Sequence, residues 1–287
     1  MSSAYRMTLM LMTCDRGIAA EAERVGVERL FVDLEVRGKA ERQAGRNTII
    51  SGHSVEDVAS VRVSAPRTEL MARINPPSAE TPSEVDAVIA AGADVIMLPL
   101  FTHQDEVAAF VEAVAGRARV CLLLETAPAV ARVDQIARVP GVDEIHVGLN
   151  DLHISFGLDF MFELVAGGIV EHVRDRVVAA NPNVRFGFGG AARISALHPV
   201  TPSDVLGEHV RLGSRMIILS RTFLEGAETL SELPEGVTLA GEVSQVREAL
   251  AAAVRRTPGE VESTRRRVQE ATWATAARIR SARATQQ

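Results

Sequence analysis

The sequence predicts a (β/α)8 barrel followed by a C-terminal helical extension. Three observations support this prediction: eight apolar segments typical of buried strands, helical segments between them, and a length of 287 residues that suits one large α/β domain. A doubly wound parallel sheet is the alternative, but the number of strands favours the closed barrel. We expect residues 1–226 to form the barrel and residues 227–287 to form a helical arm that packs subunits together.

The strand candidates are short runs rich in aliphatic and β-branched residues. They cover residues 7–13, 29–35, 69–75, 93–100, 122–125, 144–149, 185–190 and 215–221. Helical segments occupy residues 16–26, 81–92, 102–116, 160–180, 202–213, 242–256 and 260–282. Ser54 begins a capping box for a further helix, Thr102 is the expected N-cap of the 102–116 helix, and Gly167 with Gly168 should break the 160–180 helix.

Composition excludes several classes of protein. A net charge of −6 and a pI near 5.7 argue against a general nucleic-acid binder. No signal peptide and no segment long enough to span a bilayer is evident, so no membrane partner is expected. Cys14 and Cys121 form no metal or disulfide spacing, which is typical of the cytoplasm. Lys39 is the only lysine and lies in a long polar segment, which disfavours a Schiff-base aldolase.

Polar side chains stand at the carboxyl ends of the strands, where a barrel of this kind places its active site. They are Asp33, Glu35, Arg73, Asn75, Glu125, Asn150, Asp151, Ser220 and Arg221. Glu125 and Asp151 are 26 residues apart, one βα unit, so both carboxylates should emerge at the same edge of the sheet and share a cation. Oxygen ligands without a cysteine or histidine cluster predict Mg²⁺ or Mn²⁺. Ion pairs with arginines, or helix capping, are the alternative for both acids.

Arg73 carries a permanent positive charge on a planar fork. Such a group binds a carboxylate or stabilises a developing enolate oxygen, which makes Arg73 a candidate catalytic residue. A salt bridge to Glu35 or Glu125 is the alternative, and the two interpretations are compatible.

A proton carrier is sought among the histidines. His53, at the end of the long polar segment, is the first choice, and His103, His146 and His153 follow it. His146 lies within a strand and is expected to be a core residue.

A second anion site is predicted after the last two strands, where barrels commonly bind phosphate. Its residues are Gly189, Gly190 and Arg221, and turn formation is the alternative reason for the glycines.

Five segments resemble the HpcH/HpaI aldolase and citrate lyase β-subunit superfamily. They are FVDLE (31–35), ARIN (72–75), DVIMLPL (94–100), LLLETAPAV (122–130) and VDEIHVGLNDLHISFGL (142–158). The resemblance runs from about residue 8 to residue 224 and implies a metal-dependent (β/α)8 enzyme. It further implies that Glu125 and Asp151 bind the divalent ion and that Arg73 binds the substrate's carbonyl and carboxylate groups.

The chain departs from the pyruvate-using members of that superfamily at two places. Leu123 stands where they generally have a glutamine, and Glu35-Val36-Arg37 replaces an acid followed by the base histidine. FVDLE and ARIN look more like the citrate lyase side of the superfamily.

The resulting hypothesis is a divalent-metal-dependent aldolase or lyase. It would make or cleave a C–C bond next to a 2-oxo acid of the pyruvate or oxaloacetate type, through a metal-stabilised enolate, with an aldehyde as the expected second substrate. Further substrate contacts are expected from Glu35, Asn75, Asn150, Gly189, Gly190 and Arg221. The alternatives are a lyase for a malyl- or citryl-CoA-like thioester and a non-catalytic barrel that serves as an assembly partner. The resemblance also implies a homo-oligomer, a trimer or a hexamer.

Overall fold

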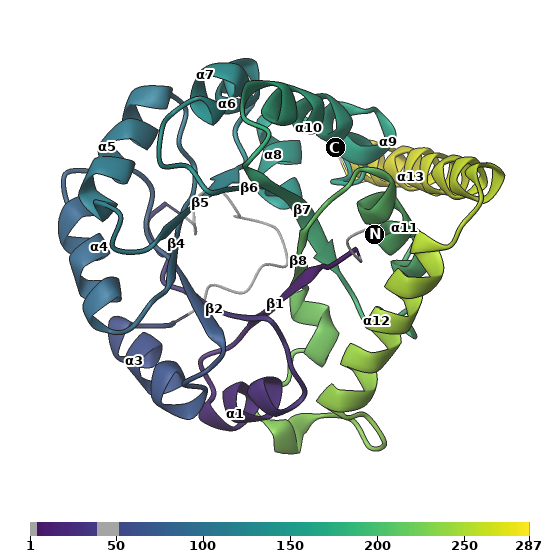
Figure 1. Ribbon diagram of the computed structural model, residues 1–287. Coiled ribbons are helices and arrows are strands. Elements are labelled where there is room, and N and C mark those ends of the chain that lie inside the picture. Colours follow the sequence, from purple (N-terminus) through teal and green to yellow (C-terminus); the bar gives the residue numbers. More distant parts are fainter. Residues whose placement is uncertain (1–4, 39–51, 287) are drawn as a thin grey trace.

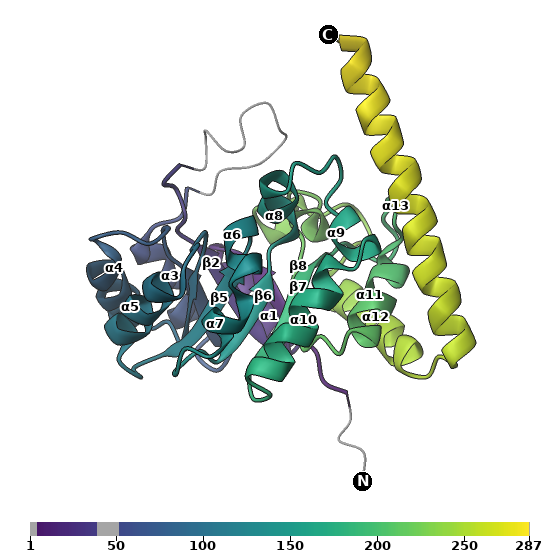
Figure 2. The ribbon, with the colours of Figure 1, turned by 90° about the horizontal axis from the view of Figure 1, so that it is seen from above.

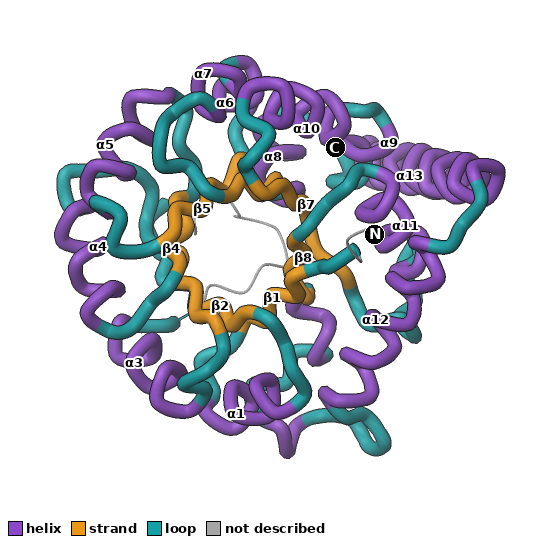
Figure 3. The backbone as a smooth tube through the Cα atoms, in the orientation of Figure 1, coloured by secondary structure: helices purple, strands orange, loops and turns teal. Residues whose placement is uncertain are grey.

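The computed structural model describes residues 5–38 and 52–286, apart from the side chains of Arg221, Thr222 and Gln286. Lys39 and most of the long polar segment after the second strand therefore lie outside the described residues. Eight parallel strands pair in the order of the sequence, and β8 pairs with β1, which closes the sheet into a barrel surrounded by helices (Figures 1 and 3). The predicted (β/α)8 barrel is confirmed.

The strands are β1 (Thr8–Met12), β2 (Arg29–Asp33), β3 (Glu69–Arg73), β4 (Val95–Leu98), β5 (Arg119–Leu124), β6 (Glu144–Val147), β7 (Arg185–Ala191) and β8 (Met216–Leu219). The helices of the barrel are α1 (Arg16–Arg24), α3 (Val55–Ser64), α4 (Thr81–Ala90), α5 (Gln104–Val114), α6 (Ala127–Ala131), α7 (Val133–Ala137), α8 (Leu149–Ser155), α9 (Glu163–Ala166), α10 (Ile169–Ala180) and α11 (Pro202–Arg211). Two short 3-10 helices, η1 (Arg221–Leu224) and η2 (Leu230–Glu232), lead to α12 (Leu239–Val254) and α13 (Pro258–Gln286).

Local capping explains where several helices begin. The capping box of α3 is confirmed, because the Asp57 carboxylate accepts the backbone N–H of Ser54 at 2.7 Å. The prediction of Thr102 as an N-cap is wrong: His103 occupies that position and accepts the backbone N–H of Asp105. Its imidazole nitrogen replaces the hydroxyl group as the capping acceptor. The predicted break is confirmed, since Gly168, with φ +80°, separates α9 from α10.

The two C-terminal helices lie in different places. α12 contacts α11 and α1 and so continues the outer ring of the barrel (Figure 1). α13 packs on α9 and α11, and its end extends beyond the end of the barrel where α8 lies (Figure 2). It buries Thr264, Val268, Thr272 and Ala276 at a spacing of four residues and leaves Trp273 47% exposed. A role of residues 227–287 in subunit packing stays a prediction. In the described ranges, no helix combines the length and apolar character needed to cross a bilayer.

The amino-terminal end of the barrel interior is closed by buried charges. The guanidinium of Arg29 donates to both carboxylate oxygens of Glu144, at 2.5 and 2.7 Å, and also pairs with Glu69. Both Arg29 and Glu144 are 0% exposed. Above them, the next part of the interior is filled by an apolar cluster that includes Met10, Phe31, Met71, Cys121 and Met216. Because side chains fill these parts of the interior, a substrate can enter only from the carboxyl-terminal end.

Candidate active site

Arg73 and two acids form a buried ionic cluster at the carboxyl-terminal end of the barrel. Arg73 ends β3 directly beside Asp33, the last residue of β2. Its Nε and Nη2 atoms each donate to a different oxygen of Asp33 at 2.8 Å, and Nη2 lies 3.2 Å from Glu35. Burial alone would lower the pKa of Arg73, but the charges of Asp33, Glu35 and Glu125 raise it above its usual value. The guanidinium is therefore held both in its charged form and in one orientation.

The predicted salt bridge from Arg73 to Glu35 is present, yet Asp33 is the closer partner. Sequence reasoning placed Asp33 among the strand-end acids without giving it a role. The sequence does indicate that Asp33 lies beside Glu35, because the two acids are two residues apart and so face the same side of an extended chain. That side is the barrel interior, where Asp33 and Glu35 are 0% and 1% exposed.

Glu125 follows β5 and is buried, with 3% of its surface exposed. Its carboxylate packs against Gly148, the N-cap of α8: a Cβ atom at Gly148 would lie only 2.7 Å from Oε2 of Glu125. Gly148 thus leaves the space that the carboxylate occupies. Gly148 has no role predicted from the sequence, although a glycine between a strand and an acidic segment is typical of a close approach between backbone and side chain.

Asp151 does not end a strand, which corrects the sequence interpretation. Strand β6 stops at Val147, and Asn150 and Asp151 lie in the first turn of α8. Asp151 is the third residue of this helix, a position whose side chain reaches back toward the N-cap. The N-cap is Gly148, against which Glu125 packs, so Asp151 lies in the first turn of the helix whose start Glu125 contacts. The sequence-based placement of both acids at the same end of the barrel holds, with a helix in place of the second strand end.

Glu125 and Asp151 are the two acids that could hold a metal ion. In the parts of the chain that the structure describes, no three His, Cys, Asp or Glu side chains gather into a metal-binding group. Mg²⁺ is commonly held by one or two carboxylates, with water and substrate completing its coordination shell. Glu125 and Asp151 fit this pattern, and their hard oxygen atoms suit Mg²⁺ or Mn²⁺.

His53 contacts the backbone of the ionic cluster. Its Nδ1 accepts the backbone N–H of Asp33 at 3.2 Å, and it lines a cavity with Asn75 and Glu84 on the α3 and α4 side of the barrel. These described contacts do not bring the ring to Arg73 or Glu125. With Nδ1 acting as an acceptor, a neutral ring carries its proton on Nε2. A role for His53 as proton carrier stays a prediction.

Two other candidate histidines contact backbone carbonyl groups. His146 is fully buried and lies 2.9 Å, through Nε2, from the carbonyl oxygen of Gly189. Burial lowers the pKa of His146 to about 4, so its ring is neutral near pH 7, as expected of a core residue. Nδ1 of His153 lies 3.2 Å from the carbonyl oxygen of Leu149 within α8.

The amide of Asn75 supports the loop after β2. Its oxygen accepts the backbone N–H groups of Val36 and Arg37, both at 3.0 Å, and its nitrogen donates to Glu84 at 3.2 Å. Through these contacts Asn75 stabilises the conformation of the loop after β2. Asn150 is exposed on α8, and substrate binding by either asparagine stays a prediction.

The glycines proposed for the anion site lie at the end of the seventh strand, within the range predicted for it. Gly189 and Gly190 belong to β7, beside an irregularity in its pairing with β8. A Cβ atom at Gly189 would lie 2.7 Å from Leu149, and one at Gly190 would lie 2.7 Å from the carbonyl oxygen of Ile218. Close packing thus accounts for both glycines. The side chain of Arg221 lies outside the described residues, and the anion site stays a prediction.

Comparison with known proteins gives the same family as the sequence motifs. The family model "HpcH/HpaI aldolase/citrate lyase" matches residues 6–188. No curated protein sequence matches. Among solved structures, an HpcH/HpaI aldolase/citrate lyase family protein from Burkholderia cenocepacia J2315 is 20% identical, with a TM-score of 0.58, and the alignment covers 86% of this chain and 94% of that one.

Two further structures have the same fold. An HpcH/HpaI aldolase from Desulfitobacterium hafniense DCB-2 is 18% identical, with a TM-score of 0.59 and coverage of 82% of this chain and 96% of that one. The citrate synthase SbnG is 17% identical, with a TM-score of 0.57, and the alignment covers 75% of this chain and 87% of that one. At these identities the structures support the fold, whereas the family model covers most of the chain. The chain therefore belongs to the HpcH/HpaI aldolase/citrate lyase family.

Proposed function

We propose that this protein is a divalent-metal-dependent lyase that makes or cleaves a C–C bond next to a 2-oxo acid. Family membership supports a lyase-type enzyme. The observation that carries the finer proposal is the packing of the Glu125 carboxylate on Gly148, within one helical turn of Asp151. Arg73 adds a fixed positive charge, and the negative charge of Glu125 helps to raise the pKa of this guanidinium.

Glu125 and Asp151 would hold the ion, and the ion, when bound, would supply Lewis-acid polarisation of the substrate carbonyl. A divalent cation stabilises neighbouring carboxylates in their charged forms. The position of Asp151 in the first turn of the helix whose N-cap Glu125 contacts supports such a role for Mg²⁺ or Mn²⁺.

Arg73 would bind the substrate and stabilise the charge that develops on its oxygen. Asp33 occupies Nε and Nη2, and among the described residues none accepts a hydrogen bond from Nη1. The N–H groups on Nη1 are therefore available to a carboxylate or to an enolate oxygen. Because Asp33 and Glu35 fix the guanidinium before the substrate arrives, little reorganisation is needed during the reaction.

The proposal is tested by measuring metal binding and turnover on the same protein. Calorimetric titration with Mn²⁺ should give saturable binding, and protein-dependent cleavage of oxaloacetate to pyruvate and CO₂, above the rate with the metal ion alone, should require Mn²⁺ or Mg²⁺ and stop on chelation. Equal turnover before and after chelation would rule the proposal out. A strict requirement for CoA would instead identify a thioester lyase, and metal binding without any turnover would favour a non-catalytic barrel.

Gly148→Ala should weaken metal binding while leaving the fold intact. The new methyl group would meet Oε2 of Glu125 at 2.7 Å and push the carboxylate away, whereas the backbone of Gly148, with φ −82°, accepts alanine. Changing a residue that orients a metal ligand typically weakens metal binding by about tenfold to 100-fold. Gly259→Ala is the matched control, because no atom lies within 4 Å of its added Cβ. Equal Mn²⁺ affinities for the two variants in calorimetry would contradict the proposed role of Glu125.

A further inference from the structure

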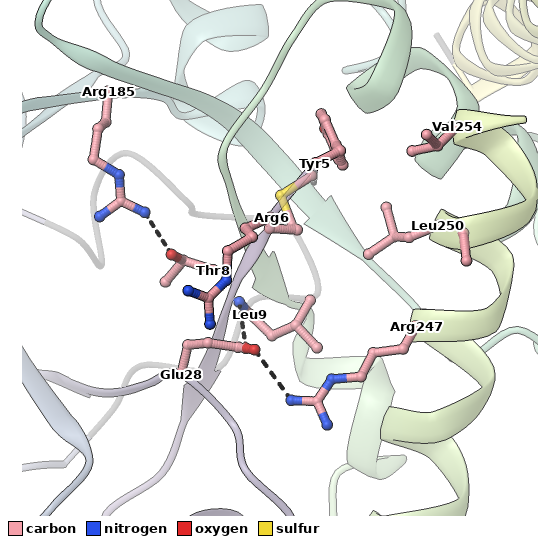
Figure 4. A pocket seen from close by; sticks show the side chains of 11 residues that line it. Tyr5, Arg6, Thr8, Leu9, Glu28, Arg185, Arg247, Leu250 and Val254 are labelled. Carbon is pink, nitrogen blue, oxygen red and sulfur yellow. Dashed lines mark hydrogen bonds and ion pairs between the residues drawn. The ribbon is translucent and has the colours of Figure 1, made fainter. Parts of the chain in front are cut away.

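A second cavity lies at the opposite end of the barrel from the candidate active site. It has a volume of about 450 Å³ and is bounded by the start of β1, by Glu28 and Arg185, and by α12 (Figure 4). This volume is within the usual range for sites that bind small molecules. The cavity shares no residue with the cluster around Arg73 and Glu125.

Three arginines, Arg6, Arg185 and Arg247, contribute to the wall of this cavity. Glu28 is the acid that lines it, and its two oxygens are already engaged by the backbone N–H of Leu9 and by Arg247, each at 3.1 Å. No such partner offsets Arg6: across residues 5–38 and 52–286, no Asp or Glu forms an ion pair with it. Arg185 pairs with the buried Glu144 at 2.9 Å, but Glu144 also pairs with Arg29. The positive charge around the cavity therefore exceeds the negative charge, and the cavity has room for an anion.

Donor groups lie together on one side of the cavity. Nη2 of Arg185 donates to the hydroxyl oxygen of Thr8 at 2.5 Å, so the hydroxyl hydrogen of Thr8 can be donated to a ligand. The guanidinium of Arg6 lies on the same side (Figure 4). Two guanidinium groups and a hydroxyl suit a phosphate monoester, which has three acceptor oxygens and a charge near −2, better than a single carboxylate.

The other side of the cavity is largely apolar. Leu250, Ala251 and Val254 present the apolar face of α12, and Tyr5 adds an aromatic ring. The Tyr5 hydroxyl donates to the carbonyl oxygen of Ser214 at 2.5 Å, and the guanidinium carbon of Arg215 lies 4.9 Å from the ring centre. Burial raises the pKa of Tyr5 to about 12, although Arg215 lowers it, so the ring stays neutral beside an anion.

We propose that this cavity binds a phosphate monoester with an apolar or aromatic body, of the nucleoside monophosphate class. The phosphate would contact Arg6, Arg185 and Thr8, and the body would lie against Tyr5 and the apolar face of α12. Such a ligand would bind at the end of the barrel where the interior is closed, so it acts as a ligand rather than a substrate of the proposed active site.

The chain offers a direct probe for this site, since Tyr5 is its only tyrosine. Protein labelled with 3-fluorotyrosine should give one fluorine NMR resonance, which reports on the cavity. Titration with AMP should shift this resonance saturably, and more tightly than adenosine or inorganic phosphate, each of which offers half of the required contacts. A resonance that stays unmoved by AMP, or that responds to phosphate as tightly as to AMP, would overturn the proposal.

Arg6→Gln removes the guanidinium that has no ion-pair partner in the described chain, and Arg6 is exposed, so folding should be preserved. Losing a charge-assisted hydrogen bond should weaken AMP binding by about tenfold or more. Arg138→Gln is the matched control, because Arg138 is an exposed arginine at the end of α7 and does not line the cavity. Equal affinities for the two variants would contradict the site. Glu125→Gln should bind AMP normally, which separates this test from that of the proposed active site.

Discussion

Replacing Glu125 by glutamine should reduce metal-stimulated kcat/KM on the order of 10³-fold or more. The change keeps the shape of the side chain but removes the charge that would hold the cation, and a Lewis acid contributes several kcal/mol of transition-state stabilisation. Asp151→Asn should have a comparable effect, because Asp151 is the second carboxylate of the proposed metal site and the described residues hold no larger cluster of metal-ligating side chains. Turnover would be measured across a series of Mn²⁺ concentrations and Mn²⁺ binding by calorimetry.

Glu112→Gln provides the matched control for these two variants. Glu112 is an exposed glutamate on α5, so its replacement makes the same chemical change away from the barrel mouth. Circular dichroism would establish that all three variants fold. If Glu125→Gln or Asp151→Asn kept wild-type metal-stimulated turnover, the proposed metal site would be wrong.

Arg73→Met should lose both activity and stability. The guanidinium lies among Asp33, Glu35 and Glu125, and Asp33 and Glu35 are almost fully buried, so its removal takes away a cation that offsets their charges. Breaking one partner of a buried ion pair typically costs about 3–5 kcal/mol of unfolding free energy. The loss of the substrate-binding N–H groups should reduce kcat/KM by about 10²-fold to 10³-fold, as for one oxyanion-binding donor.

Arg73→Lys separates the structural part of this effect from the catalytic part. Lysine keeps a positive charge near Asp33 and Glu35 but not the planar fork that donates twice to Asp33. Denaturant unfolding should therefore show partial recovery of stability, while kcat/KM stays low. Recovery of full activity in Arg73→Lys would show that only charge matters and that the oriented guanidinium does not bind substrate.

The sequence by itself determined the barrel and most of the candidate residues. Eight apolar runs alternate with helical segments, and a chain with that pattern buries both faces of each strand only in a parallel α/β fold. The polar residues that interrupt those runs then fall at the open end of the barrel. For the same reason, Arg73 and Glu125 could be placed there from their positions in the chain.

Only the tertiary structure decided how these residues are paired. Arg73 binds Asp33 most closely because β2 and β3 lie side by side with these two residues in register, which no single strand reveals. Position 148 requires a glycine because the side chain of Glu125, which follows another strand, occupies the space that a Cβ atom would fill. The cavity around Arg6 joins β1 to α12 across more than 240 residues, and contacts between such distant segments depend on the closed fold and not on local pattern.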